Sequence, residues 1–177
     1  MKLAMLSLFA LAGCAQAPTR ELELVRSRIE EVKIVEGPVY APELLAESEA
    51  ALAKAYRLTI EDEAYHESIR FAAQARWKAD EAYIKATREK QLVARHVARL
   101  MGDLEVLLDI ARSRGADREA GEELLEFEKH RARIVDFAET GDLLTALAEG
   151  KSFKPELVRF EMRFRNSAPL PLPLHHP

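Results

Sequence analysis

Glutamates and histidines are the residues of this chain whose spacing could support metal chemistry. Glu63 and His66 stand three residues apart, which puts both side chains on one face of a helix. A di-iron site in a helical bundle needs two such pairs and two further glutamates, whereas Glu126 and His130 have a spacing of four on another segment. We therefore interpret Glu63 and His66 as solvated residues at a helix start, and we predict no metal ligands.

The remaining histidines give no stronger signal. His96 stands beside Arg95 and Arg99, which favours a surface position, and His175 and His176 lie in a tail where they would bind metal only weakly. The sequence also has no glycine-rich phosphate loop, Gly-x-Ser-x-Gly elbow or Cys-x-x-Cys pair. We expect no catalytic residues, no cofactor and no enzymatic activity.

The only cysteine is placed for a different reaction, the transfer of lipid to its thiol. An apolar run over residues 3–11 precedes it, and about nine residues make a helix of only about 14 Å, too short to span a bilayer. The run is therefore the core of an export signal. Small residues before the cysteine suit a peptidase that draws extended backbone into a narrow site. The tetrapeptide resembles the lipobox of bacterial lipoproteins: Leu11, Ala12, Gly13 and Cys14.

This resemblance implies that residues 1–13 are removed and that Cys14 carries diacylglyceryl and N-acyl lipid. Several acyl chains anchor a protein stably, where one would be marginal. In known lipoproteins an aspartate just after the cysteine favours inner-membrane retention, and this chain has Ala15 there. We expect a lipid anchor in the outer membrane, facing the periplasm. The formal charge of −4, with both signs interspersed, argues against nucleic acid as a partner.

Composition favours an all-α protein. Charged residues make up 32% of the chain and aromatic residues 7%, as in long helices and coiled coils. We predict antiparallel helical hairpins that share one long central helix, followed by an extended or disordered tail. The predicted parts are a signal peptide (1–13), a lipid-proximal tether (14–18), a helical domain (19–150), a short amphipathic segment (151–166) and a proline-rich tail (167–177).

The first two predicted helices are short. One opens at Thr19 and ends at Gly37-Pro38, and the next has Pro42 at its first position, where a missing N–H costs nothing. Thr59 and Asp62 are candidate caps for the helix that follows. The predicted buried stripes are Leu22, Val25, Ile29 and Val32 in the first helix, and Leu44, Ser48, Ala51, Ala55 and Leu58 in the second.

A heptad pattern without proline continues from Tyr65 to Ala111 and predicts one helix of about 50 residues. We expect its first half to pair back with the 42–58 helix and its second half to pair forward with a helix after Gly115. Lys90 would mark the change of partner, and Gly102 a kink or break. The predicted stripe is Tyr65, Ile69, Ala72, Arg76, Ala79, Tyr83, Ala86, Lys90, Val93, Val97, Leu100, Leu104, Leu107 and Ala111.

Later elements are predicted from turn residues. Gly115 should cap the long helix, with Asp117 as the N-cap of a helix over 118–138. A short helix over 143–148 should then end at Gly150. The segment 156–165 fits either a strand, because apolar and charged residues alternate, or a helix from Pro155; the lack of a partner strand favours the helix.

The stretch Tyr40-Ala41-Pro42-Glu43-Leu44-Leu45-Ala46-Glu47-Ser48-Glu49-Ala50-Ala51-Leu52-Ala53-Lys54-Ala55 adds a second resemblance, supported by Tyr65 and by alanines at 72, 75, 79 and 82. Over residues 15–100 the chain resembles a family of small bacterial envelope lipoproteins with an alanine-rich helical domain of unknown function. Some members carry it ahead of an OmpA-like peptidoglycan-binding domain, which this sequence lacks. The resemblance implies an envelope location and no catalytic residues.

These observations predict a non-enzymatic periplasmic scaffold or adaptor that docks an envelope protein. The expected docking residues are Val158, Phe160, Met162 and Phe164. The first alternative is a helical module that binds a lipid or another amphipathic ligand, and the second is a metal-dependent enzyme. For the binding module, the expected groove residues are Phe71, Trp77 and Tyr83, although helix packing is the simpler role for these aromatics.

Overall fold

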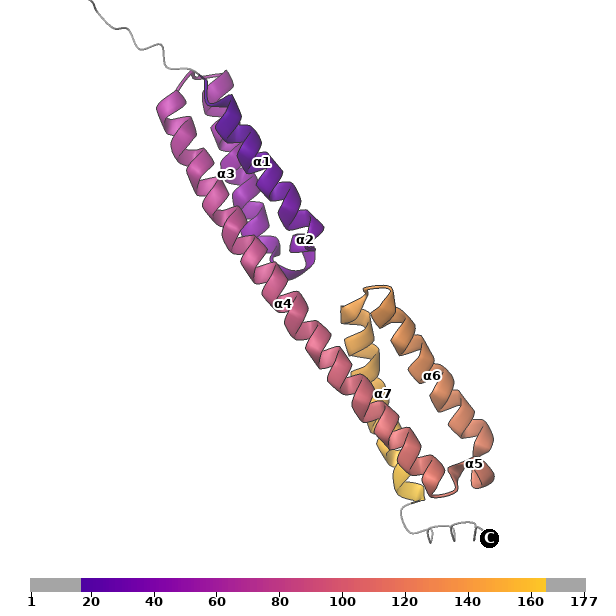
Figure 1. Ribbon diagram of the computed structural model, residues 1–177. Helices are drawn as coiled ribbons and strands as arrows, with labels where there is room; N and C mark the ends of the chain where they lie inside the picture. Colours follow the sequence, from indigo (N-terminus) through magenta and orange to yellow (C-terminus); the bar gives the residue numbers. More distant parts are fainter. Residues whose placement is uncertain (1–16, 165–177) are drawn as a thin grey trace, which may run out of the picture. The chain divides into compact units, whose positions relative to one another are not determined.

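A computed structural model describes residues 17–164, and these residues form seven helices (Figure 1). The predicted all-α class is confirmed, as is the long central helix with partners for each of its halves. The described residues form two compact units that divide between Thr87 and Arg88, close to Lys90. The lipobox and the proline-rich tail, with His175 and His176, lie outside the described residues.

Unit 1 contains α1 (Thr19–Ile34), α2 (Gly37–Tyr40), α3 (Pro42–Ile60) and the first part of α4 (Tyr65–Ser113). All four predicted stripe residues of α1 are buried, and Pro42 does open α3. The predicted end of α1 at Gly37-Pro38 is displaced: Glu36 adopts the left-handed conformation, with φ 62°, and Gly37 begins α2. Gly37 is required there because a Cβ would overlap Val32.

The core of unit 1 is built largely from alanine. In α3 the predicted Ser48, Ala51 and Ala55 are buried. Leu45 and Leu52 are buried as well, whereas the predicted Leu44 and Leu58 are only half-buried. In the first half of α4 the predicted Ala72, Ala79 and Ala86 are buried. The predicted Ile69, Arg76 and Tyr83 are each one residue too late. The buried series is Ser68, Ala72, Ala75, Ala79, Ala82 and Ala86, whereas Ile69 and Arg76 are exposed and Tyr83 is half-buried.

The two serine hydroxyls buried in this alanine core are hydrogen-bonded. The buried Ser48 hydroxyl donates to the carbonyl oxygen of Ala75 at 2.7 Å and so links α3 to α4. Ser68 donates to the carbonyl oxygen of Ala55 at 2.8 Å and bonds the hydroxyl of Thr59. The predicted capping role of Thr59 is therefore wrong: it bonds Ala55 and Ser68 near the end of α3.

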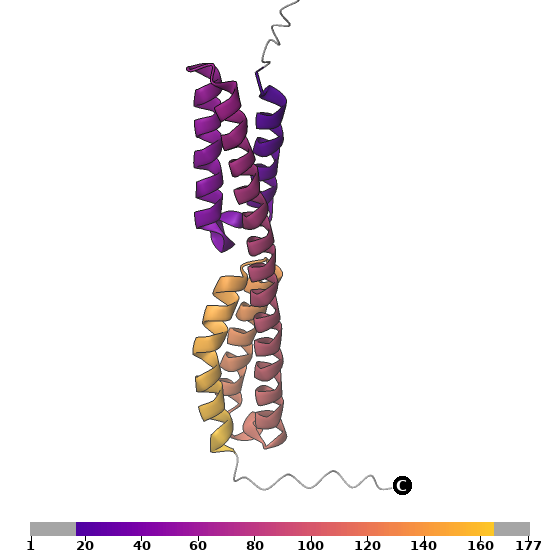
Figure 2. The same ribbon diagram turned by 90° about the vertical axis from the view of Figure 1, so that its left-hand side faces the viewer.

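Unit 2 contains the rest of α4, α5 (Ala116–Glu119), α6 (Gly121–Glu139) and α7 (Leu143–Arg163), shown in Figure 2. Its core is made of large side chains. The late stripe of α4 is confirmed, with Leu108 more deeply buried than the predicted Leu107. The largest fully buried side chains are Phe153, Phe160, Leu104, Leu108, Ile134 and Leu157.

Three predictions about glycines in unit 2 have different outcomes. Gly115 does turn the chain after α4, with φ 93°, but α5 intervenes and the next long helix begins at Gly121 instead of residue 118. A break at Gly102 is wrong, because α4 is continuous through it. A helix end at Gly150 is also wrong: α7 continues to Arg163, which settles the helix-or-strand alternative for 156–163 in favour of the helix.

Gly150 serves close packing in place of a turn. A Cβ at this position would overlap the side chain of Leu100 on α4. The start of α7 is predicted correctly: Gly141 has φ 90°, and the carboxylate of Asp142 accepts a hydrogen bond from the backbone N–H of Thr145.

Candidate functional site

The predicted docking residues on α7 do not share one surface. Phe160 and Phe164 are buried in the core of unit 2, Val158 is half-buried, and Met162 is exposed. The reason is the helix: its period of 3.6 residues separates side chains that alternate in a strand. Only Met162 of these four offers most of its side chain to a partner.

The predicted groove residues Phe71, Trp77 and Tyr83 are also not brought together. They follow one another at intervals of six residues, and each interval rotates the side chain by about 120° around a helix. Phe71 lies under the Lys54 ammonium group, 4.0 Å from its ring centroid, and Tyr83 lies under the Arg28 guanidinium at 4.2 Å. Trp77 is 56% exposed. They form no common platform.

One side of the Trp77 ring lies against the charged side chain of Lys78. The Lys78 ammonium lies 4.7 Å from the indole centroid and 2.7 Å from a Glu47 carboxylate oxygen. The hydrogen bond to Glu47 raises the pKa of Lys78 above its ordinary value. The exposed indole therefore has one cation beside its ring at the surface of unit 1.

Exposed apolar side chains gather near Trp77 along α1 and α4. A shallow cleft of about 170 Å³ between these helices is lined by Leu24, Ile69 and Ala73 among others, and Trp77 stands one helical turn beyond Ala73. Leu24 is 54% exposed and Ile69 45% exposed. We call Leu24, Ile69, Ala73 and Trp77 the apolar strip. This strip was predicted from the sequence only in part, because Trp77 alone of these four residues was expected to line a groove.

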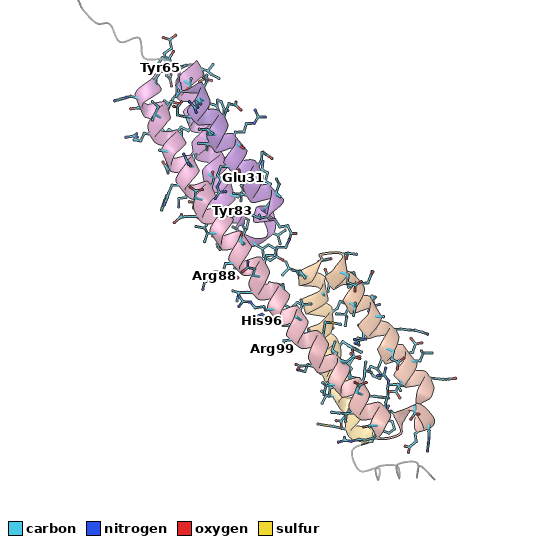
Figure 3. All side chains as sticks on the ribbon, viewed as in Figure 1. Glu31, Tyr65, Tyr83, Arg88, His96 and Arg99 are labelled. Atoms are coloured by element: carbon cyan, nitrogen blue, oxygen red, sulfur yellow. The ribbon has the colours of Figure 1, made fainter. Side chains whose placement is uncertain are left out.

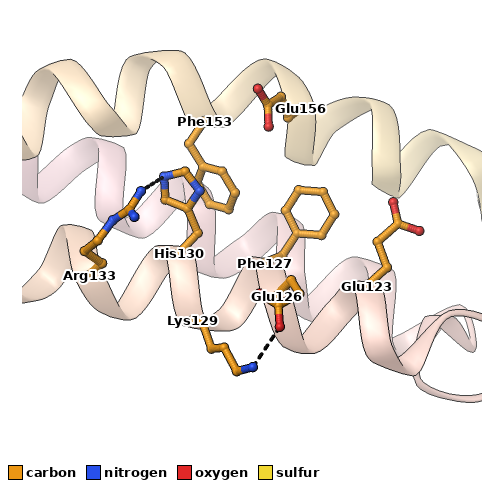
Figure 4. A pocket seen from close by; sticks show the side chains of 8 residues that line it. All are labelled: Glu123, Glu126, Phe127, Lys129, His130, Arg133, Phe153 and Glu156. Atoms are coloured by element: carbon orange, nitrogen blue, oxygen red, sulfur yellow. Dashed lines mark hydrogen bonds and ion pairs between the residues drawn. The ribbon is translucent and has the colours of Figure 1, made fainter.

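A second hollow lies between α6 and α7 in unit 2, with a volume of about 500 Å³ (Figure 4). Its floor is aromatic: the Phe127 and Phe153 ring centroids are 5.5 Å apart, and His130 stacks on Phe153 at 4.2 Å. Phe127 also packs on Phe160, with centroids 4.7 Å apart. In the sequence these aromatic residues show only that α6 and α7 have apolar sides. The hollow between the two helices could not be predicted from that pattern.

The rim of this hollow is charged and mostly paired within itself. Lys129 donates to Glu126 at 2.7 Å, and Arg133 lies 3.1 Å from His130 Nε2 (Figure 4). His130 Nε2 is in turn 3.3 Å from a Glu149 carboxylate oxygen. These pairs hold His130 flat against the aromatic floor. The arrangement can accept a small amphipathic molecule, but no nucleophile and base face one another across it.

The Glu-x-x-His pair is separated by the fold. Glu63 has φ 49° in the turn before α4, so it does not share a helical face with the exposed His66. Within residues 17–164 there is no group of three or more histidine, cysteine, aspartate or glutamate side chains able to hold a metal ion. His96 is exposed, as predicted.

Among the described helices, none combines the length and apolarity that a membrane crossing requires. Comparison with known proteins yields no match to this chain, whether to a family model, a curated protein or a solved structure.

Proposed function

We propose that this chain is a lipid-anchored helical scaffold or adaptor of the bacterial cell envelope, without catalytic activity. The proposal combines the lipobox-like Leu11–Cys14 sequence with the apolar strip of unit 1. The single observation that supports docking most directly is Trp77, a large aromatic that is 56% exposed beside a shallow apolar cleft. Exposed apolar groupings with polar surroundings mark protein interaction sites, and tryptophan is enriched among residues that dominate binding energy.

The geometry favours a helix as the docked element. Leu24, Ile69 and Ala73 line the cleft between α1 and α4, and Trp77 lies one helical turn beyond Ala73 outside that lining. An amphipathic partner helix would place apolar side chains at successive turns against Ile69, Ala73 and Trp77. The apolar strip as a whole was not predicted from the sequence, because Leu24 and Ile69 come from different helices. The partner is an envelope protein, and the membrane is reached through Cys14.

The alternative of a lipid-binding groove around Trp77 has less support. The cleft there has about 170 Å³, while pockets for small molecules usually have about 300–1,000 Å³. The alanine core beside it leaves helices α3 and α4 in direct contact, as the Ser48–Ala75 hydrogen bond shows. The hollow between α6 and α7, with about 500 Å³, is the better candidate if a small amphipathic ligand is bound.

In-cell photo-crosslinking tests the adaptor proposal. A photoreactive residue at position 77 of the lipid-anchored protein should give one dominant protein adduct by mass spectrometry. Position 162 is the comparison on α7, because Met162 is exposed while Phe160 is buried. Position 53, an exposed alanine of α3, is the control within unit 1. Equal adduct patterns at 77 and 53, or a lipid adduct at 77, would remove the support for a protein partner.

The metal-dependent alternative has its own test. Elemental analysis of the folded, purified protein should find no stoichiometric metal, and a stoichiometric transition metal that survives dialysis would revive the enzyme reading.

A further inference from the structure

Three arginines of α4 in unit 2, Arg88, Arg95 and Arg99, form a row on one side of the helix. Intervals of seven and eleven residues bring Arg95 and Arg99 within about 20° of Arg88 around the helix axis and extend the row over about 16 Å. All three side chains are exposed, and Figure 3 shows Arg88 and Arg99 on the side of α4 away from α6 and α7. We call these residues the arginine row.

The arginine row is unpaired among the described residues. None of its guanidinium groups makes an ion pair; Arg95 donates only to the carbonyl oxygen of Gln91, at 3.3 Å. Five other arginines of unit 2 contact carboxylates: Arg112, Arg114, Arg131, Arg133 and Arg163. Arg118 and Arg159 make no such contact either, but they lie on α5 and α7 and not on one side of one helix. Between residues 88 and 102 the only carboxylate is Glu89, which is rotated by about 100° from Arg88.

This part of α4 is positively charged, whereas the whole chain has a negative formal charge. Residues 85–99 hold five lysines and arginines and one acid, a formal charge of +4, in a chain whose formal charge is −4. Arg95 and Arg99 stand four residues apart, where like charges on a helix repel each other, and no ion pair of the described residues involves them. Asp103, four residues after Arg99, is paired with Lys154. An anion from outside the chain would relieve the repulsion.

We propose that the arginine row binds the phosphate groups of anionic phospholipids at a membrane surface. Guanidinium groups match phosphate oxygens with two parallel donors, and Val106, 56% exposed, continues the same side of α4 as an apolar contact. The choice of a membrane over an acidic protein rests on the proposed function, because the lipid on Cys14 would keep a membrane within reach. Binding itself needs no anchor.

Vesicle binding of the full chain with Cys14→Ser tests this. The apolar run 3–11 contributes to neutral and anionic vesicles alike, so the measured quantity is the ratio of partition coefficients on vesicles with and without 30% anionic lipid. Replacing the arginine row by glutamine (R88Q/R95Q/R99Q) should lower this ratio about tenfold or more, and 0.5 M salt should do the same to the unsubstituted chain.

A matched control removes the same charge elsewhere in unit 2. Arg118, Lys151 and Arg159 are exposed, and R118Q/K151Q/R159Q should change the ratio by less than about threefold. Equal losses in both variants would overturn the proposal and indicate diffuse charge attraction. Binding of polyglutamate that needs the arginine row, without any effect on vesicles, would assign the row to an acidic protein. Neither result would affect crosslinking from position 77, so the two proposals fail separately.

Discussion

Gly102 and Gly150 both lie inside helices, but their surroundings differ. Gly102 is exposed on α4, and a Cβ there would have no heavy atom within 4 Å; at Gly150 a Cβ would overlap Leu100. The sequence shows two glycines in helical patterns, and it predicted a kink or break at Gly102 and a helix end at Gly150. It could not distinguish them, because the difference lies in which helix passes opposite.

Gly102→Ala should stabilise the protein by about 1 kcal/mol, because alanine loses less backbone entropy than glycine in a helix interior and meets no obstacle here. Urea unfolding followed by circular dichroism measures this free energy. A loss of stability would show that α4 needs the flexibility of Gly102.

Gly150→Ala should have the opposite sign, with a loss of about 1–3 kcal/mol, because the added methyl group must displace Leu100 or push α7 away from α4. The same urea experiment checks it. Leu100→Ala in the Gly150→Ala background should recover part of the loss; if it adds a further full loss, the two positions do not touch.

Helices were predictable as elements, while their buried sides were predictable only in part. The apolar stripe of α1 was complete in the sequence, because large aliphatic residues alternate with charges. In α4 the stripe chosen from large residues, including Tyr65, Ile69 and Tyr83, passed over the alanines that are buried. Small side chains give a weak hydropathy signal, yet they are what allows three helices to approach closely in unit 1.

Because the core of unit 1 is built largely from alanine, a larger side chain inside it should lower the stability of the unit strongly. Ala79→Leu should destabilise unit 1 by about 1–3 kcal/mol, because Ala79 is fully buried and the helices on either side cannot separate without exposing the core. Ala53→Leu, on the exposed side of α3, should change stability by less than about 0.5 kcal/mol. Similar effects of both substitutions in thermal unfolding would contradict tight packing of the core.

Pro155 is an unusual residue for the interior of α7. It has no N–H, so the helical hydrogen bond to the Lys151 carbonyl oxygen is missing, and the predicted helix start at Pro155 was reasonable on those grounds. Pro155→Ala should stabilise the protein by about 1–2 kcal/mol, the gain of the hydrogen bond less the added freedom of the unfolded chain. Unchanged stability in chemical unfolding would mean that packing of the proline ring beside Leu100 and Val158 offsets the gain.

At the scale of the whole molecule, the two units have separate cores. One cluster of buried residues extends from Leu22 to Ala86, and another from Val97 to Phe164. The change from alanine to leucine along α4 was visible in the sequence, and it correctly indicated a change of partner near Lys90. The apolar strip and the hollow between α6 and α7 were not visible in the sequence, because each combines residues from two helices.

Because the two units have separate cores, a destabilising substitution in one unit should leave amide hydrogen exchange in the other unit unchanged. Ala79→Leu should accelerate amide hydrogen exchange in α1 and α3 and leave exchange in α6 and α7 unchanged within about twofold. Hydrogen-exchange mass spectrometry resolves the two sets of peptides. Faster exchange throughout would show that the molecule unfolds as one cooperative unit.

The alanine core of unit 1 also limits how this protein can evolve. A single base change in an alanine codon yields only glycine, proline, serine, threonine, valine, aspartate or glutamate. Each of these enlarges the side chain, buries a charge or weakens the helix at Ala75, Ala79 or Ala82, and serine is the smallest of the changes. Leucine codons in unit 2 lead to other aliphatic residues by one step. Mutational tolerance should therefore be lower in unit 1, although its side chains are the smaller ones.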